Sequence, residues 1–230
     1  MDLLLQSVYF SIFMQLLTGL VQLDGLFIKL PKEHQILQDV LKLETLVQFI
    51  EASFYVWLVF NYKNIARMAS KRYYDWMVTT PAMLLATIIY MKYSEHKERK
   101  VGAELPEMKF SSFITENQLN IVKIFVSNAL MLLCGFLGEI GKVAMTTSVA
   151  IGSIFFLYTF YLIWEEYAKH SGEGVKLFKF LFIVWGLYAV AAVMRPKKKN
   201  IGYNLLDIVS KNFYGLYIYY VIKTLSLKTL

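Results

Sequence analysis

Residues 203–215 read YNLLDIVSKNFYG, an apolar stretch broken by a few polar side chains. The polar side chains recur at intervals of three and four residues, so they share one face of a helix; they are Asn204, Asp207, Lys211 and Tyr214. Asp207 and Lys211 stand one helical turn apart, at the spacing that lets a carboxylate and an amine pair. The stretch therefore predicts a helix that carries a charged face into apolar surroundings.

The composition of the whole chain places that helix in a membrane. Of the 230 residues, 57% are hydrophobic and 18% are charged, and the mean hydropathy is +0.47. The charged residues gather between apolar runs, which is typical of a protein embedded in a lipid bilayer. The net charge of +7 lies in short joints and at helix ends, where lipid headgroups are nearer than phosphodiesters, so we expect no nucleic-acid partner.

Neither a disulfide nor a metal site is predicted. Cys134 has no second cysteine to pair with, and the three histidines, His34, His96 and His170, fall in predicted loops far apart in the sequence.

The apolar runs are long enough to cross a bilayer, which takes a helix of about 20 residues. Seven runs qualify, and they are Leu3–Leu23, Leu43–Tyr62, Tyr73–Tyr93, Leu119–Gly141, Thr146–Tyr167, Leu177–Met194 and Tyr203–Thr224. Polar joints separate them, at Lys29–Asp39, Asn61–Lys71, Ser94–Thr115, Gly141–Met145, Lys169–Lys176 and Arg195–Asn200. Helical spacing in every run argues against a β-barrel. We predict an all-α fold, a single seven-helix membrane domain spanning residues 1–230.

The third run carries a second charged face, formed by Arg72, Asp75 and Thr79. A charge near the bilayer centre costs roughly 2.5–3.5 kcal/mol, so such residues are candidates for function. Lys211 could instead extend its side chain to the membrane surface, although apolar helix flanks it on both sides. For Arg72, at the start of its run, a position at the membrane surface and a buried position are equally open. A buried amine beside carboxylates can condense with an aldehyde to a Schiff base, and Asp75 or Asp207 would balance its charge.

Two motifs resemble those of the microbial rhodopsins. Residues 72–81 read RYYDWMVTTP, similar to the family signature RYxDWxxTxP, and residues 207–211 follow its D-x-x-x-K pattern. Residues 131–141, MLLCGFLGEIG, are similar to the proteorhodopsin branch, and the compact length resembles the small rhodopsins of giant algal viruses.

The resemblance implies a retinal-binding photoreceptor and not an enzyme. All-trans retinal would form a protonated Schiff base on Lys211, with Asp75 as main counterion and proton acceptor and Asp207 as second counterion. The remaining pocket residues would be Trp76 and Trp185 on either side of the polyene, with Thr80, Met131 and Tyr188. Plain packing is the alternative for the aromatic residues. The N-terminus would lie outside the cell and the C-terminus inside; many relatives form homo-oligomers, but nothing in this sequence selects a state.

The chain departs from the pattern of outward proton pumps. The carboxylate that returns the proton belongs eleven residues after the counterion, where this chain has Ala86. Ala189 replaces a proline after the tyrosine of the sixth run, and the joint 195–200 has no acid for proton release. These departures weaken the prediction of a pump.

Two further polar faces indicate an ion pathway. The first run carries Ser7, Ser11, Gln15, Thr18 and Gln22, and the second carries Glu44, Gln48 and Glu51, in both cases at helical spacing. Simple hydrogen bonding between two helices is the alternative. The second run also resembles the glutamate-lined helix of channelrhodopsins. A residue pair of those proteins, from two other helices, falls at Thr80 and Asn128 of this chain.

We therefore predict a light-gated cation channel, ahead of a light-driven outward proton pump and, third, a sensory photoreceptor. The pathway would comprise Arg72, Ser11, Gln15, Glu44, Gln48, Glu51 and Asn204. Glu51 should lie at the depth of Lys211, bonded to Ser11 or Gln15 and to Asn204 or its neighbours. Glu44 should attract cations at the inner mouth.

Overall fold

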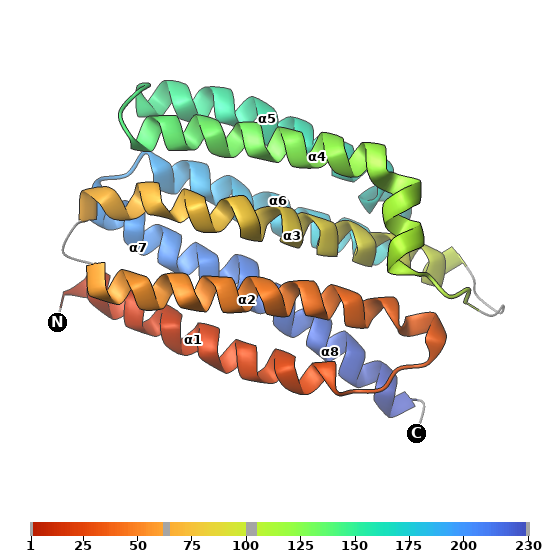
Figure 1. The fold of residues 1–230 in the computed structure, drawn as a ribbon. Coiled ribbons are helices and arrows are strands. Elements are labelled where there is room, and N and C mark those ends of the chain that lie inside the picture. The colour runs from red at the N-terminus through yellow and green to blue at the C-terminus, as the bar shows by residue number, and fades with distance from the viewer. Residues whose placement is uncertain (1, 62–64, 100–104, 229–230) are drawn as a thin grey trace.

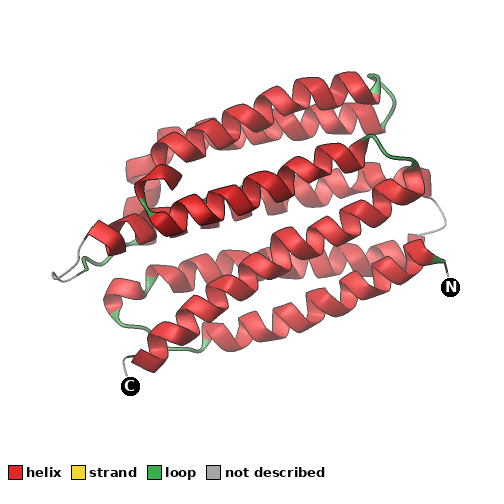
Figure 2. Cartoon of the chain, turned by 180° about the vertical axis from the view of Figure 1, so that it is seen from behind, coloured by secondary structure: helices red, strands yellow, loops and turns green. Residues whose placement is uncertain are grey.

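The structure, a computed structural model, describes residues 2–61, 65–99 and 105–228. In this part of the chain seven long helices run side by side as one bundle, and the two termini lie at opposite ends of it (Figure 1). The first six are α1 (Leu3–Leu26), α2 (Ile36–Asn61), α3 (Ile65–Arg99), α4 (Phe110–Glu139), α5 (Met145–Glu166) and α6 (Gly172–Ala192). The seventh is continuous through α7 (Pro196–Asp207), a π-helical turn (Ile208–Asn212) and α8 (Phe213–Lys228). Figure 2 shows helices and loops only among these residues, so the predicted fold class is confirmed.

The helices have the length and the outer surface of membrane spans. Five of them, α1, α2, α4, α5 and α6, are long and apolar enough to cross a bilayer on composition alone. The other two, α3 and the seventh helix, carry the charged faces found in the sequence. Large apolar side chains point outward around the bundle, among them Phe13, Leu20, Ile154 and Ile183, each at least 61% exposed. Lipid tails can cover such a surface, whereas water would not.

Most helices extend further than their apolar runs, which corrects the predicted joints. The second helix starts at Ile36 and not at Leu43, and α3 covers Ile65–Arg99, so His96 is helical and not in a loop. The predicted end of the second helix, Tyr62, lies outside the described residues. Hydropathy marks where the chain crosses hydrocarbon, but backbone hydrogen bonding continues into the polar layer, where charged side chains face water.

The π-helical turn holds Lys211. A π turn accommodates one more residue than an α turn, so it changes the direction in which the following side chains point, and such turns are frequent at functional sites. The predicted polar face of this helix is nevertheless intact, since Asn204, Asp207, Lys211 and Tyr214 are all at most 2% exposed.

Apolar side chains fill much of the interior, and polar faces meet beside them. Between the middle of the bundle and its C-terminal end, α3 contributes a dry core of Ala86, Ile88 and Ile89, packed with residues such as Tyr167 and Leu181. The polar faces of α1 and α2 turn instead toward each other and toward the seventh helix.

At the N-terminal end, Asp2 caps α1 by accepting a hydrogen bond from the Leu4 backbone N–H at 3.3 Å. It also pairs with Lys197 at the start of α7 at 2.6 Å. The hydrogen bond from Lys197 lowers the pKa of Asp2 below its ordinary value. The contact fixes the first and last helices to each other at this end.

Candidate functional site

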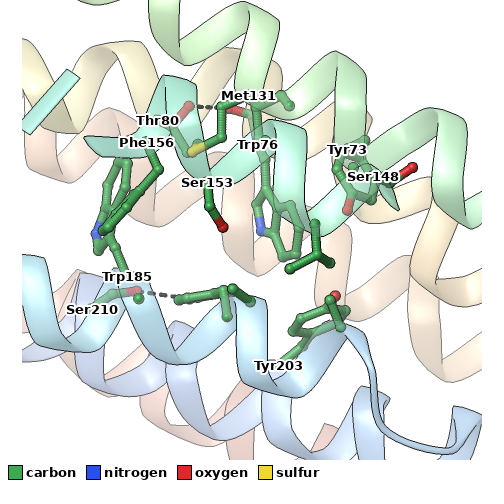
Figure 3. Close-up of a pocket in the computed structure, with 18 of the residues that line it drawn as sticks. Tyr73, Trp76, Thr80, Met131, Ser148, Ser153, Phe156, Trp185, Tyr203 and Ser210 are labelled. Atoms are coloured by element: carbon green, nitrogen blue, oxygen red, sulfur yellow. Dashed lines mark hydrogen bonds between the residues drawn. The ribbon is translucent and has the colours of Figure 1, made fainter. Parts of the chain in front are cut away.

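A cavity of about 130 Å³ inside the bundle has Lys211 among its lining residues. Figure 3 shows other residues that line it. Helices α3, α4, α5 and α6 supply its other walls. Every pocket residue predicted from the resemblance, apart from the two aspartates, lines it; these residues are Trp76, Thr80, Met131, Trp185, Tyr188 and Lys211. The rest of the lining includes Tyr73, Ser148, Gly152 and Phe156.

The two tryptophans form opposite walls of this cavity. In Figure 3, Trp76 and Trp185 flank Ser153, which points into the space between them. The ring of Trp76 meets Tyr188 and Tyr203 edge to face, with centroids 5.4 and 5.1 Å apart. Edge-to-face contacts of this kind hold aromatic rings in one orientation, so the cavity is a rigid apolar slot.

Beyond Trp76, Thr80 ties α3 to α4. Its hydroxyl donates to the Trp76 carbonyl at 2.8 Å, and it accepts a hydrogen bond from Asn128 Nδ2 at 2.8 Å. The sequence placed Thr80 and Asn128 as counterparts of a known residue pair, and the structure brings them into contact.

Three carboxylates surround the Lys211 amine. Its Nζ lies 3.3 Å from Asp75 Oδ2 and 3.4 Å from Asp207 Oδ1, and it also donates to Glu51 Oε2. The lysine side chain is 2% exposed, so the alternative in which it extends to the membrane surface is wrong. Two of these acids were predicted neighbours; Glu51 was expected at the same depth but with other partners.

Asp207 is the most firmly held of the three acids. Tyr55 donates to its Oδ2 at 2.7 Å and Tyr188 to its Oδ1 at 2.8 Å, while Arg72 Nη1 pairs with Oδ2 at 2.9 Å. With Lys211 as a fourth donor, both carboxylate oxygens are satisfied. Asp75, by contrast, has one oxygen, Oδ1, without a hydrogen-bond partner. Asp207 is therefore held by four donors, whereas Asp75 keeps one oxygen without a hydrogen-bond partner.

Arg72 is fully buried, so the alternative of a surface arginine is wrong. Besides Asp207 it bonds Asn204 and, at 3.2 Å, the Tyr55 hydroxyl. A buried guanidinium needs such compensation, because a buried charge without partners is costly. Arg72 closes the space between Lys211 and the N-terminal end of the bundle.

The polar faces of α1 and α2 meet as predicted. All five members of the α1 face are at most 8% exposed, and Gln48 Nε2 donates to the Gln15 carbonyl at 3.0 Å. Ser11 donates to the Asn204 backbone carbonyl at 3.3 Å, and Asn204 Nδ2 donates to Ser7 Oγ at 2.8 Å. The two faces thus form one continuous polar seam that reaches the seventh helix.

Two details of the predicted pathway need correction. Glu51 Oε2 accepts a hydrogen bond from Lys211, and none joins Glu51 to Ser11, Gln15 or Asn204 in the described part of the chain. Glu44 is only 1% exposed, so it lies inside the protein and not at an open mouth.

Sequence reasoning missed Tyr55, which links Asp207, Asn204 and Arg72. A signal was present, because Tyr55 follows Glu51 by four residues and so continues the polar face of α2. It also missed Ser210, whose hydroxyl lies 3.0 Å from the Tyr188 hydroxyl. Ser210 precedes Lys211 directly, and the π turn brings it to the cavity wall.

A buried lysine that opens into an apolar slot within seven membrane helices defines a retinal-binding membrane protein. The chain belongs to the family of bacteriorhodopsin-like proteins, whose model matches residues 5–225. It is a microbial rhodopsin, an integral membrane protein that binds retinal as a Schiff base on a lysine. The cavity fits this group, since its walls are largely aromatic and apolar and Lys211 is among the residues that line it.

Solved structures agree with this assignment. The chain is similar to the viral rhodopsin OLPVRII, with 27% identity, 95% of this chain and 96% of the other covered, and a TM-score of 0.77. A blue light-absorbing proteorhodopsin from Med12 aligns at 18% identity over 97% and 98% of the chains, with a TM-score of 0.74. Xanthorhodopsin, a light-driven ion pump with dual chromophore, aligns at 18% identity over 99% and 95%, with a TM-score of 0.73. A search of curated protein sequences finds no match.

Proposed function

We propose that this rhodopsin is a light-gated cation channel in which Lys211 is the retinal lysine and the seam between α1, α2 and the seventh helix is the ion path. One observation carries the proposal: Glu51 belongs to the polar face of α2 and bonds the Lys211 amine. A movement at Lys211 therefore acts directly on a carboxylate in the path.

Retinal held on Lys211 would supply the absorption of light and the change of shape that moves the Lys211 nitrogen. Before light is absorbed, the carboxylates of Asp75 and Asp207 balance the positive charge at Lys211 Nζ. Asp75 Oδ1, which has no partner, accepts the proton that leaves Lys211 Nζ. Asp207 keeps its charge because Tyr55, Tyr188 and Arg72 donate to it throughout.

The gate follows from the same contacts. Around Lys211 stand three carboxylates, Glu51, Asp75 and Asp207, against two cations, Arg72 and Lys211. Three carboxylates this close repel one another when all are ionised, so one of the three is protonated before Lys211 Nζ moves. Displacement of Lys211 Nζ frees Glu51 from its donor, and water can then join the two ends of the seam. Carboxylate, amide and hydroxyl oxygens along the seam attract cations and replace part of their hydration shell. They belong to Ser11, Gln15, Gln48, Glu51 and Asn204.

An outward proton pump is the second candidate, and the observation that favours it is the free oxygen of Asp75 beside Lys211. A sensory photoreceptor comes third. For all three we infer that the N-terminus lies outside the cell, so that Arg72 faces outward and Glu44 inward.

Photocurrents under voltage clamp test the proposal. A channel passes current in both directions according to the voltage, a pump passes current of one sign, and a sensor passes none. A current that keeps one sign at every voltage would transfer the assignment to the pump.

A further inference from the structure

A groove of about 400 Å³ lies on the outer surface of the bundle, between α5 and α6. Its α5 wall is built from side chains three and four residues apart, which share one face of the helix. Most of the lining is aromatic, so the groove is largely apolar. The lining residues are Leu157, Phe160, Tyr161, Trp164, Phe178, Lys179 and Phe182.

Lys179 is the charged residue of this groove. It is exposed and lies about 10 Å along the helix from the start of α6. The acids near it in the chain have other partners. Glu173 pairs with Lys176 at 2.7 Å. Glu165 pairs with Lys169. Among the described residues, Lys179 is therefore a cation without a carboxylate partner, on a surface that meets lipid.

We propose that the groove binds one acyl chain of an anionic phospholipid, whose headgroup phosphate bonds Lys179. An acyl chain matches the apolar walls, and a headgroup of net negative charge supplies the partner that Lys179 lacks. Trp164 and Tyr161 are of the types enriched where hydrocarbon meets headgroups, so both parts of one lipid are within reach of the groove. On the orientation proposed above, this boundary belongs to the cytoplasmic leaflet, which carries anionic lipids.

The groove shares an aromatic wall with the retinal cavity. Phe160 of the groove meets Trp185 edge to face, with ring centroids 5.9 Å apart. Phe182 of the groove stacks on Phe156 at 5.3 Å. Trp185 and Phe156 line the cavity on the other side. A lipid chain in the groove therefore packs against the outside of the cavity wall. Because it binds only the folded protein, it should stabilise the retinal-loaded form.

Quenching of Trp164 fluorescence by brominated lipid tests the binding. The retinal-loaded protein carries Trp57→Phe, which removes a second tryptophan on the outer surface, and is reconstituted in phosphatidylcholine vesicles. Brominated phosphatidylglycerol should quench as strongly as an about fivefold larger fraction of brominated phosphatidylcholine, the ratio expected for one lysine beside an anionic headgroup. Equal quenching by the two lipids would overturn the proposal, because it would indicate ordinary contact with bulk lipid.

Variants of Lys179 locate the site. Lys179→Gln should abolish the preference for the anionic lipid, and Lys179→Arg should keep it, because the positive charge remains. Lys223→Gln, which removes an exposed lysine of α8 toward the same end of the bundle, is the matched control and should keep the preference. A preference that persists in Lys179→Gln, or that is lost in Lys223→Gln, would contradict binding in this groove.

Thermal bleaching of the visible band tests the shared wall. Vesicles that contain phosphatidylglycerol should slow the bleaching of the wild type relative to phosphatidylcholine alone, whereas Lys179→Gln should bleach at the same rate in both. The same lipid dependence in both proteins would show that the anionic lipid acts elsewhere. Neither readout involves a photocurrent, so this proposal and the channel can fail separately.

Discussion

Lys211 Nζ in the π turn of the seventh helix donates a hydrogen bond to Glu51 Oε2 on α2. This contact joins two features that the sequence presents separately, a charged centre on α3 and the seventh helix and a polar seam along α1 and α2. Both side chains are at most 2% exposed, so the contact lies well inside the membrane bundle. On the proposed channel function, it is the point at which a light signal opens the seam.

The first prediction concerns the retinal lysine. Lys211→Ala, mixed with all-trans retinal, should show no visible absorption band, because no other amine opens into the cavity among its described lining residues. Lys199→Ala is a suitable control, since this buried lysine instead pairs with Glu139 at 2.9 Å near the other end of the seventh helix. A normal visible band in Lys211→Ala would remove the basis for the whole site.

A second prediction concerns Asp75. The carboxylate stabilises the positive charge at Lys211 Nζ more before excitation than after it, when the charge moves away along the polyene. Asp75→Asn should therefore shift the absorption maximum to longer wavelength. The comparison with Asp207→Asn is informative: a larger shift in that variant, with none in Asp75→Asn, would assign the main counterion to Asp207.

Glu51 should control the current. Glu51→Ala should strongly change the amplitude or the selectivity of the photocurrent, since it removes the only carboxylate that bonds Lys211 from α2 among the described residues. Because of this bond we also expect a shift of the absorption maximum. Ser53→Ala, on the exposed face of α2, is the control and should leave both unchanged. Wild-type photocurrents in Glu51→Ala would mean that the polar seam serves packing only.

Tyr55 should stabilise the charged centre. Tyr55→Phe removes a hydrogen bond to Asp207 and leaves the ring in place, so the protein should lose about 1.5–3 kcal/mol of stability, the range for hydrogen bonds to charged groups. The loss can be measured as faster thermal bleaching of the visible band. Tyr220→Phe, at an outward-facing position that is 65% exposed, should bleach like the wild type. Equal bleaching of the two variants would show that Tyr55 adds nothing to the anchoring of Asp207.

The sequence predicts the helices and their inner faces well, because both follow from local spacing. The faces of Ser7–Gln22 and Glu44–Glu51 are buried as the helical period requires. Helix ends are predicted less well, since α3 continues past Tyr93 to Arg99 through polar residues that carry no apolar signal.

The partners of individual side chains depend on how helices are placed relative to one another. Glu51 could have bonded α1 or the seventh helix from the same position on α2, and only the packed bundle selects Lys211. The burial of Glu44, which is 1% exposed, has the same origin. Periodicity identifies the face on which a residue lies, but not its distance from an atom on another helix.

The reversal potential of the wild-type photocurrent is the most direct test of the channel. In cells under voltage clamp, the current should change sign with voltage, and its reversal potential should move by roughly 59 mV for each tenfold change in the gradient of a permeant monovalent cation. Na⁺, K⁺ and H⁺ can be varied in turn to identify that ion. A steady outward current that never reverses and ignores all three gradients would contradict the channel and leave a proton pump.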